Sequence, residues 1–208
     1  MYKKISVLIP VYNEFHTIES CLERVLKADV GNLEMEVIIS DNNSNDGTKE
    51  LLGKINDQRV KILYRKENNG KGANIKNALK EASGDLILFQ DGDLEYSPND
   101  YLALLEPFFL FNADVVYGSR LTRAKATAII GFPNYIGNIL FTLVANFLYN
   151  KIFTDIATGS KVFKKDIIKN LEITSDGFEI EPEITAKISK NKKIKIFEVP
   201  ITINSRRY

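Results

Sequence analysis

The stretch "LILFQDGDLEYSPND", residues 86–100, begins as an apolar run and then places four acids within ten residues. An apolar run of this length, bounded by Gly and polar residues, is consistent with a strand buried in a parallel sheet. Acids crowded at the end of a buried strand repel one another unless a cation balances them. The stretch therefore predicts a strand that leads directly into a charged site. The acids are Asp91, Asp93, Glu95 and Asp100.

The first 120 residues alternate short apolar runs with stretches of helical periodicity. This alternation implies crossover connections and a mostly parallel sheet with helices on both faces. The ends of the five predicted strands then converge on one edge of the sheet, where ligands bind. Strands are predicted at 4–11, 35–40, 60–65, 85–90 and 113–119, and helices at 16–28, 47–55, 71–82 and 98–111.

The second half of the chain breaks this rhythm without signs of a separate domain. No linker rich in Pro, Gly or Ser and no internal repeat divides the sequence. We therefore predict one α/β domain over residues 1–208. The elements predicted for the second half are a basic loop, "RLTRAK" (120–125), a helix at 134–150, a strand at 160–165, a helix from about Pro182 and a strand at 193–201.

Composition and charge narrow the classes of function. The chain has 28 Lys plus Arg against 27 Asp plus Glu, so a net charge near +1 gives no long-range attraction to nucleic acid or an anionic membrane. The single cysteine, Cys21, excludes an internal disulfide framework and a cysteine-rich zinc site, and it fits a reducing compartment. The near-zero net charge predicts no nucleic-acid partner. The segment before Tyr12 has too few apolar residues for a signal peptide, which predicts a cytoplasmic protein.

An uncharged segment of 25 residues, 126–150, is long enough on paper to cross a bilayer. Its pattern instead predicts an amphipathic helix at 134–150, because polar residues recur every four positions along one side. We favour packing of the apolar side on its own domain, since amphipathic helices usually cover a core, and contact with a membrane surface is the alternative. The polar residues are Asn134, Asn138, Thr142, Asn146 and Asn150.

Polar residues follow each of the five predicted strands. The Ser, Asn and Asp residues at 43–48 are typical of a capped turn before a helix, which would leave Asp41 free at the end of its strand. The Gly-rich turn "NNGKGAN" (68–74) opens a helix whose backbone donors, with Lys71, are suited to a phosphate. A plain strand-to-helix turn explains the same residues equally well.

Asp91 and Asp93 stand on either side of Gly92, which lets the backbone bring both carboxylates toward one point. Two hard oxygen ligands at this spacing suit Mg²⁺ or Mn²⁺, which bind few carboxylates and keep waters and substrate phosphates as further ligands. A solvated acidic turn is the alternative. We favour a metal site, because clustered acids at the edge of the sheet need a counter-charge.

Eight motifs, which follow one another over nearly the whole chain, resemble the inverting nucleotide-sugar transferases of glycosyltransferase family 2. Within this family the chain is similar to the dolichol-phosphate mannose and dolichol-phosphate glucose synthases. The resemblance implies a GT-A fold, a bound Mg²⁺ or Mn²⁺, a nucleotide-sugar-binding half (1–120) and an acceptor-side half (121–208). The motifs are "VLIPVYNE", "SDNNSNDGT", "NNGKGAN", "GDLILFQDGDLEYSP", "DVVYGSR", "TDIATGSKVFKKD", "DGFEIEPEITAKI" and "KIFEVPITI".

The resemblance implies roles for two groups of residues. The donor group would line the base and ribose pocket and approach the donor; its members are Pro10, Tyr12, Glu14, Asp41 and Lys71. The reaction group would hold the metal and diphosphate with Asp91 and Asp93, complete the metal shell with Glu95, meet a phosphate with Arg120 and supply an acid in Glu183. Asp91 would also lie near the donor sugar and ribose.

The implied reaction moves a hexose from a GDP- or UDP-sugar to polyprenyl or dolichyl phosphate at the cytosolic membrane face, with peripheral membrane contact through helix 134–150. A lipid phosphate is already a nucleophile at neutral pH, because its second pKa is about 6. Transfer to a hydroxyl is an alternative that needs a general base, for which Glu181 and Glu183 are the candidates, and Glu183 better matches the family's acid at this place. A non-catalytic sugar-nucleotide binding module is a further alternative, because Asn42 stands where the family usually has a second acid.

Overall fold

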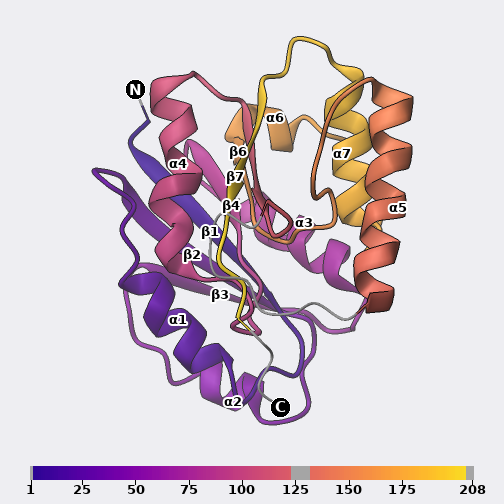
Figure 1. The fold of residues 1–208 in the computed structure, drawn as a ribbon. Coiled ribbons are helices and arrows are strands. Elements are labelled where there is room, and N and C mark those ends of the chain that lie inside the picture. The colour runs from indigo at the N-terminus through magenta and orange to yellow at the C-terminus, as the bar shows by residue number, and fades with distance from the viewer. Residues whose placement is uncertain (1, 123–131, 205–208) are drawn as a thin grey trace.

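The computed structural model describes residues 2–122 and 132–204, which fold around a seven-stranded sheet (Figure 1). The strand order is β3-β2-β1-β4-β6-β5-β7. The strands are β1 (Lys4–Val11), β2 (Glu34–Asp41), β3 (Val60–Tyr64), β4 (Leu86–Phe89), β5 (Val115–Ser119), β6 (Lys161–Lys164) and β7 (Ile196–Pro200).

The sheet is mostly parallel, as the alternation of strands and helices predicts. β6 runs antiparallel to its two neighbours, β4 and β5, while every other neighbouring pair is parallel. Because β4 and β5 both oppose β6, the first five strands all point the same way. Their carboxyl ends therefore lie on one edge of the sheet, as predicted.

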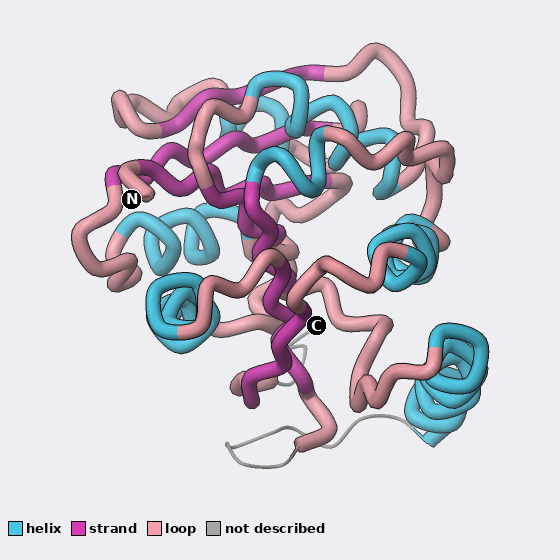
Figure 2. The backbone as a smooth tube through the Cα atoms, turned by 90° about the horizontal axis from the view of Figure 1, so that it is seen from above, coloured by secondary structure: helices cyan, strands magenta, loops and turns pink. Residues whose placement is uncertain are grey.

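Helices cover both faces of the sheet (Figure 2). One face packs against α1, α2 and α4, and the other packs against α3, α6 and α7. The helices are α1 (Ile18–Leu26), α2 (Thr48–Leu52), α3 (Lys71–Glu81), α4 (Tyr101–Leu110), α5 (Phe132–Tyr149), α6 (Lys165–Lys169) and α7 (Ile180–Lys190), and the short 3₁₀ helix η1 (Pro98–Asp100) leads into α4.

The central strand β1 shows why both faces must be covered. Ile5, Val7 and Ile9 join the core under α1 and α4, whereas Leu8 joins the core under α3 and α7. All four side chains are fully buried. Burial of one such side chain stabilises the fold by about 1.5–3 kcal/mol, so an apolar strand of this kind belongs in the middle of a two-faced sheet.

The predicted elements agree with the structure, with two differences near the carboxyl terminus. α6 was not predicted, because its five residues are too few to show a helical repeat. α7 begins at Ile180, two residues before the predicted start. Pro182 is tolerated there because the first turn of a helix contains backbone N–H groups without an intrahelical partner.

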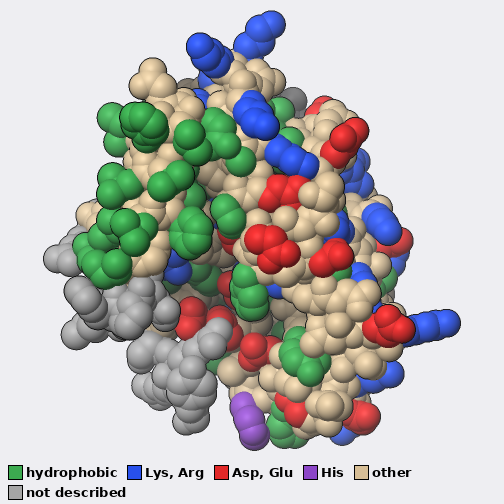
Figure 3. Space-filling model, turned by 90° about the vertical axis from the view of Figure 1, so that its right-hand side faces the viewer, with side chains coloured by type: hydrophobic (Ala, Val, Ile, Leu, Met, Phe, Trp, Pro, Cys, Tyr) green, Lys and Arg blue, Asp and Glu red, His purple; other side chains and the backbone are tan. Residues whose placement is uncertain are grey.

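Helix α5 is turned the opposite way from our favoured interpretation. Its polar stripe faces the protein: Asn138 and Thr142 are buried, together with the small Ala145. Its large apolar side chains face outward, and Figure 3 shows hydrophobic side chains gathered over this helix. Packing of the apolar side on its own domain was therefore wrong. The exposed residues are Ile136, Leu140, Phe141, Leu143, Val144, Phe147 and Leu148.

The sheet allows a test of how tightly its strands are joined at the start of β4. Gly84 donates its N–H to Ser6 Oγ at 2.8 Å, and a Cβ at this position would lie 2.6 Å from the Ser6 backbone nitrogen. We expect Gly84→Ala to lower the free energy of unfolding by about 1–3 kcal/mol. The added Cβ would overlap the backbone of Ser6 in β1, which cannot move away without disturbing the sheet.

The matched control is Gly137→Ala in α5, where an added Cβ meets nothing within 4 Å. This substitution should leave stability unchanged or raise it by up to about 1 kcal/mol, because Ala favours a helix over Gly. Urea unfolding of both variants measures the difference. Equal stability of the two variants would contradict the close packing at Gly84.

Candidate active site

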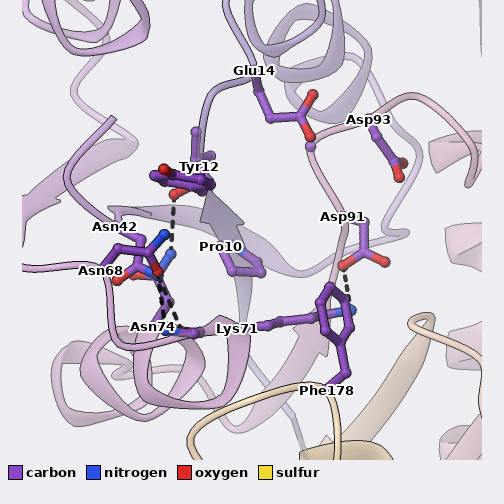
Figure 4. Close-up of a pocket in the computed structure, with 13 residues that line it drawn as sticks. Pro10, Tyr12, Glu14, Asn42, Asn68, Lys71, Asn74, Asp91, Asp93 and Phe178 are labelled. Carbon is purple, nitrogen blue, oxygen red and sulfur yellow. Dashed lines mark hydrogen bonds and ion pairs between the residues drawn. The ribbon is translucent and has the colours of Figure 1, made fainter. Parts of the chain in front are cut away.

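A cavity of about 360 Å³ opens at the carboxyl ends of β1, β2 and β4, beside the start of α3 (Figure 4). This volume lies within the range of small-molecule sites. Six of the predicted site residues line it: Pro10, Tyr12, Glu14, Lys71, Asp91 and Asp93. Its other lining residues are Val11, Asn42, Asn68, Gly70, Asn74, Gly92 and Phe178.

The turn after β4 places its two aspartates in the cavity wall. Asp93 Oδ1 accepts the backbone N–H of Glu95 at 3.1 Å, which closes the turn. Leu94, between Asp93 and Glu95, has a φ of +65°, in the left-handed region that non-glycine residues rarely adopt. Backbone strain of this kind is found at functional sites, where the surrounding structure maintains it.

Lys71, the first residue of α3, provides a positive charge beside these acids. Its Nζ lies 2.7 Å from Asp91 Oδ1 and 3.5 Å from Glu181 Oε1 in α7. Burial disfavours the ammonium, but Asp91 and Glu181 outweigh burial and raise the pKa of Lys71 above its ordinary value. The side chain therefore stays charged and joins two acids from different parts of the chain.

Two backbone donors at the start of α3 are bonded within the protein and are not available to a phosphate. Gly72 N–H donates to the carbonyl of Gly177 at 3.2 Å, and Ala73 N–H donates to that of Asp176 at 2.9 Å. A Cβ on Gly72 would lie 2.6 Å from the carbonyl oxygen of Ser175. The glycine is thus needed for close approach of the loop at 175–177. The Lys71 side chain, which lies in the cavity wall, is the contact of this turn that best fits a phosphate.

The opposite side of the cavity is neutral and aromatic. Tyr12 is half-exposed at its wall, and Asn42 lies beside Asn68, whose Oδ1 accepts from Asn42 Nδ2 at 2.6 Å (Figure 4). Asn74 Nδ2 donates to the carbonyls of Val11 and Ser40, at 3.2 and 2.6 Å. This amide therefore joins the carboxyl ends of β1 and β2.

Asp41 does not line the cavity, contrary to prediction. Its carboxylate is fully buried and accepts the backbone N–H of Ser44 at 3.2 Å, within the turn that follows β2. The predicted capped turn itself is present, since Asp46 Oδ1 accepts the N–H of Thr48 at 3.0 Å. Asn42, the next residue along the chain, occupies the cavity wall instead.

Arg120 is held in place by a fully buried carboxylate. Its Nε and Nη2 donate to the two oxygens of Asp155 at 2.7 and 2.8 Å, and Asn138 of α5 donates to the same carboxylate at 2.8 Å. Burial disfavours the charged guanidinium, but Asp155 outweighs burial and raises the pKa of Arg120. Arg120 is not among the residues that line the cavity.

Tyr96 connects Arg120 to the acidic turn. Its hydroxyl accepts from Arg120 Nη1 at 3.4 Å and from the backbone N–H of Gly159 at 2.8 Å. The backbone of Gly159 lies so close to Asp91 that a Cβ would be 2.4 Å from the carboxylate oxygen Oδ2. Arg120 and Asp91 thus belong to one connected cluster.

Glu183 lies outside the cavity wall and is bonded elsewhere. Its carboxylate accepts the backbone N–H groups of Thr174 and Ser175, both at 2.8 Å, and pairs with Lys187 at 2.7 Å. Burial raises the pKa of this carboxyl, but the bonds from Lys187 and Ser175 outweigh burial and hold the pKa well below its usual range. The geometry makes Glu183 a support for the loop at 174–175 and disfavours it as a base.

The acids that were expected to bind metal are not assembled as a set of three ligands. Within residues 2–122 and 132–204, no group of three or more His, Cys, Asp and Glu side chains is arranged to hold a metal ion. Glu95, the expected third ligand, is absent from the cavity wall and contributes its backbone N–H to Asp93. Asp91, Asp93 and Glu14 do line the same cavity (Figure 4).

Sequence reasoning missed Phe178 and Asp155, and it considered Glu181 only as a candidate base and not as a partner of Lys71. Phe178 lines the cavity, with Lys71 Nζ 5.9 Å from the centre of its ring. Glu181 approaches Lys71, and Asp155 holds Arg120. The only available signal was their presence in the motifs "DGFEIEPE" and "TDIATGS", which does not show where a side chain points.

Comparison with known proteins agrees with this architecture. The sequence model of glycosyl transferase family 2 matches residues 6–172. A solved structure of glucosyl-3-phosphoglycerate synthase from Mycobacterium tuberculosis, in complex with Mn²⁺, UDP and glucosyl-3-phosphoglycerate, superposes with a TM-score of 0.74. At 20% identity, covering 99% of this chain and 72% of that one, the likeness shows a shared GT-A fold.

Two curated relatives are similar over almost the whole chain. A Pyrococcus furiosus protein named dolichol-phosphate mannosyltransferase is 29% identical over 206 residues, 98% of this chain and 57% of the relative. A Methanococcus voltae protein named UDP-N-acetylglucosamine–dolichyl-phosphate N-acetylglucosaminyltransferase is 26% identical over 222 residues, 96% of this chain and 85% of the relative. This chain therefore spans little more than half of the Pyrococcus relative. Because the family's sequence model matches most of the chain and the sheet has the GT-A architecture, the protein is a member of glycosyl transferase family 2.

Proposed function

We propose that the protein is an inverting, metal-dependent glycosyltransferase that moves a hexose from a GDP- or UDP-sugar to polyprenyl or dolichyl phosphate. The observation that carries this proposal is the cavity at the strand ends, whose wall contains the carboxylates of Glu14, Asp91 and Asp93 and the ammonium of Lys71, which pairs with Asp91. Such a set fits a diphosphate bound together with a dication. The names of the two relatives support the acceptor, because both contain dolichol or dolichyl phosphate.

The neutral side of the cavity is suited to the nucleoside of the donor. Tyr12 and Pro10 provide apolar surface for a base, and the Asn42 and Asn68 amides provide donors and acceptors for its edge or for ribose. Glu14, also in the wall, is suited to the ribose hydroxyls. Asp41 is not part of this proposal, because its carboxylate is committed to Ser44.

The acidic side fits a divalent cation. Asp91 and Asp93 supply hard oxygen ligands from one turn, and diphosphate oxygens and water would complete the shell, as Mg²⁺ and Mn²⁺ prefer. When bound, the ion supplies positive charge that stabilises the leaving nucleoside diphosphate. The neighbouring solved structure that holds Mn²⁺ with UDP supports this assignment.

Lys71 and Arg120 have separate roles in this proposal. Lys71 lies in the cavity wall, where it can meet the diphosphate as negative charge grows on it. Arg120, fixed by Asp155, is suited to orient the phosphate of the acceptor. Attack by a phosphate oxygen on the sugar carbon, opposite the leaving diphosphate, inverts that carbon in a single displacement.

A lipid-phosphate acceptor explains why no base is needed. A phosphate monoester with a second pKa of about 6 is already ionised at neutral pH, so it needs positioning more than proton removal. The hydroxyl-acceptor alternative relied on Glu183, whose carboxylate is bonded to Thr174, Ser175 and Lys187. The binding-module alternative relied on Asn42, yet both aspartates of the acidic turn are in the cavity wall.

Helix α5 supports peripheral contact with a membrane surface. Phe147 is 88% exposed and Leu148 64%, and Ile152, just beyond the helix, is 93% exposed. The segment 126–150 contains no charge that would resist burial among lipids. None of the described helices has the length and apolarity to cross a membrane.

The same helix is bonded to the site. Asn138 on the buried side of α5 shares Asp155 with Arg120, so hydrogen bonds to one buried carboxylate connect the helix to the proposed phosphate contact. A protein whose acceptor lies in a bilayer must bring its site to the lipid headgroups. The inverted orientation of α5 is consistent with that requirement.

The metal and diphosphate assignment predicts the effect of Asp93→Asn. We expect about a 100-fold or greater loss of hexose transfer from UDP- or GDP-sugar to polyprenyl phosphate with Mn²⁺, because the carboxylate charge is lost where the ion binds. The control is Asp176→Asn, an exposed acid on the loop at 175–177, which should retain near-normal transfer. Wild-type levels of transfer by Asp93→Asn would contradict the assignment.

The position of Glu183 predicts that Glu183→Gln keeps turnover within a few-fold of wild type, with the same pH dependence. The variant should instead be less stable at neutral pH. Because the folded pKa of Glu183 lies below its ordinary value of about 4.3, its carboxylate stabilises the fold above that pH, and this contribution fades as the pH falls.

Urea unfolding at pH 7 and at pH 3.5, with transfer assays across pH 6–9, measures both effects of Glu183→Gln. The stability difference from wild type should shrink at the lower pH. A large loss of turnover with unchanged stability would restore Glu183 as the general base and favour a hydroxyl acceptor.

The membrane proposal predicts that Phe147→Ser with Leu148→Ser weakens binding to anionic lipid vesicles by about tenfold or more, because two large side chains lose apolar contact. Cosedimentation with vesicles measures it. The control pair, Leu102→Ser with Leu110→Ser, removes exposed apolar residues of α4 and should bind as wild type does. Equal binding by both pairs would rule out α5 as the contact.

A further inference from the structure

Four charged side chains form a continuous row from the cavity into the core. Lys71 Nζ lies between Asp91 Oδ1, at 2.7 Å, and Glu181 Oε1, at 3.5 Å. The other oxygen of Glu181 pairs with Lys161, the first residue of β6. Two positive and two negative charges thus alternate, and only part of the row lines the cavity.

Glu181 uses its two oxygens unequally. Oε2 accepts from Lys161, whereas Oε1 is buried and, among the described residues, accepts no hydrogen bond. Lys71 is close enough to Oε1 for an ion pair but lies nearer to Asp91. A buried acceptor without a hydrogen bond is unfavourable. A small movement of the Lys71 ammonium away from Asp91 would provide that bond.

Lys161 ties Glu181 to the core. It is fully buried, and its Nζ donates to the carbonyls of Ile156 and Thr158 as well as to Glu181. The ammonium also lies 4.9 Å from the centre of the Tyr117 ring. With so many fixed partners, Lys161 holds Glu181 as a stationary carboxylate.

A dication at Asp91 changes what Lys71 can do. In the described arrangement the Lys71 ammonium occupies one Asp91 oxygen, and a second positive charge at the same carboxylate would repel it. Lys71 then needs another acceptor within reach of a side-chain rotation. The diphosphate offers one, and Glu181 offers one that is already in place.

We propose that Glu181 is a positioning residue that receives Lys71 when the metal and nucleotide bind, so that Asp91 becomes available to the ion. Lys161 keeps Glu181 in the receiving position. This inference rests on the proposed function, because it assumes a divalent ion at Asp91. A purely structural row of charges would instead affect stability and leave metal binding unchanged.

The test removes the row behind Lys71 without leaving a buried charge unpaired. The double variant Lys161→Met with Glu181→Gln replaces both charges by neutral groups of similar shape, a change that buried ion pairs often tolerate. Calorimetric titration of Mn²⁺ into protein saturated with UDP, and separately with GDP, gives the metal affinity. We expect it to weaken about tenfold, while nucleotide binding without Mn²⁺ stays within twofold of wild type.

Two further variants separate positioning from structure. The matched control, Lys164→Met with Asp114→Asn, removes a 2.7 Å ion pair between the last residue of β6 and the residue before β5, and it should leave Mn²⁺ affinity unchanged. In a Lys71→Met background, where no ammonium competes for Asp91, the Lys161→Met, Glu181→Gln change should weaken Mn²⁺ binding by less than twofold. Non-additivity of this kind identifies an effect that passes through Lys71.

The outcomes distinguish this inference from the proposed function. If wild type binds neither nucleotide nor Mn²⁺, the proposed function fails. If wild type binds both and the double variant binds Mn²⁺ equally well, or if the tenfold loss persists in the Lys71→Met background, the role of Glu181 is overturned while the proposed function stands.

Discussion

The ion pair between Lys71 and Asp91 joins the fold to its chemistry. Asp91 follows the central strand β4, and Lys71 begins α3 on the face of the sheet that also carries α7. A carboxylate at a partly buried strand end needs a positive charge, and this ion pair provides it. Because both residues also line the cavity, the groups that balance each other's charge are the groups that we propose for diphosphate and metal.

The second half of the chain supports this edge of the sheet instead of forming a separate unit. Phe178 enters the cavity wall, Gly159 lies against Asp91, and Asp155 fixes Arg120. The division into a nucleotide-sugar-binding half and an acceptor-side half therefore stays a prediction, because residues from both halves of the chain line the cavity. α5 shares in the same support through Asn138, which explains why its polar side faces inward.

The sheet and six of the thirteen residues that line the cavity were predicted from the sequence, because apolar strands and convergent polar ends depend on local pattern. The errors concern side chains whose direction depends on distant partners. Asp41 turns into its own loop, and Glu183 supports residues 174 and 175, which sequence spacing does not reveal. The inward side of α5 is set by Asp155, 17 residues beyond Asn138, so the helical pattern alone did not decide which side is exposed.

The central claim is that the cavity binds a nucleoside diphosphate together with a divalent ion. The most direct measurement is the melting temperature of the wild-type protein with millimolar UDP or GDP, each with and without Mn²⁺. A ligand that binds only the folded state raises this temperature. Our account predicts a rise with at least one nucleotide and a larger rise when Mn²⁺ is added; no rise with either nucleotide, with or without Mn²⁺, would contradict it.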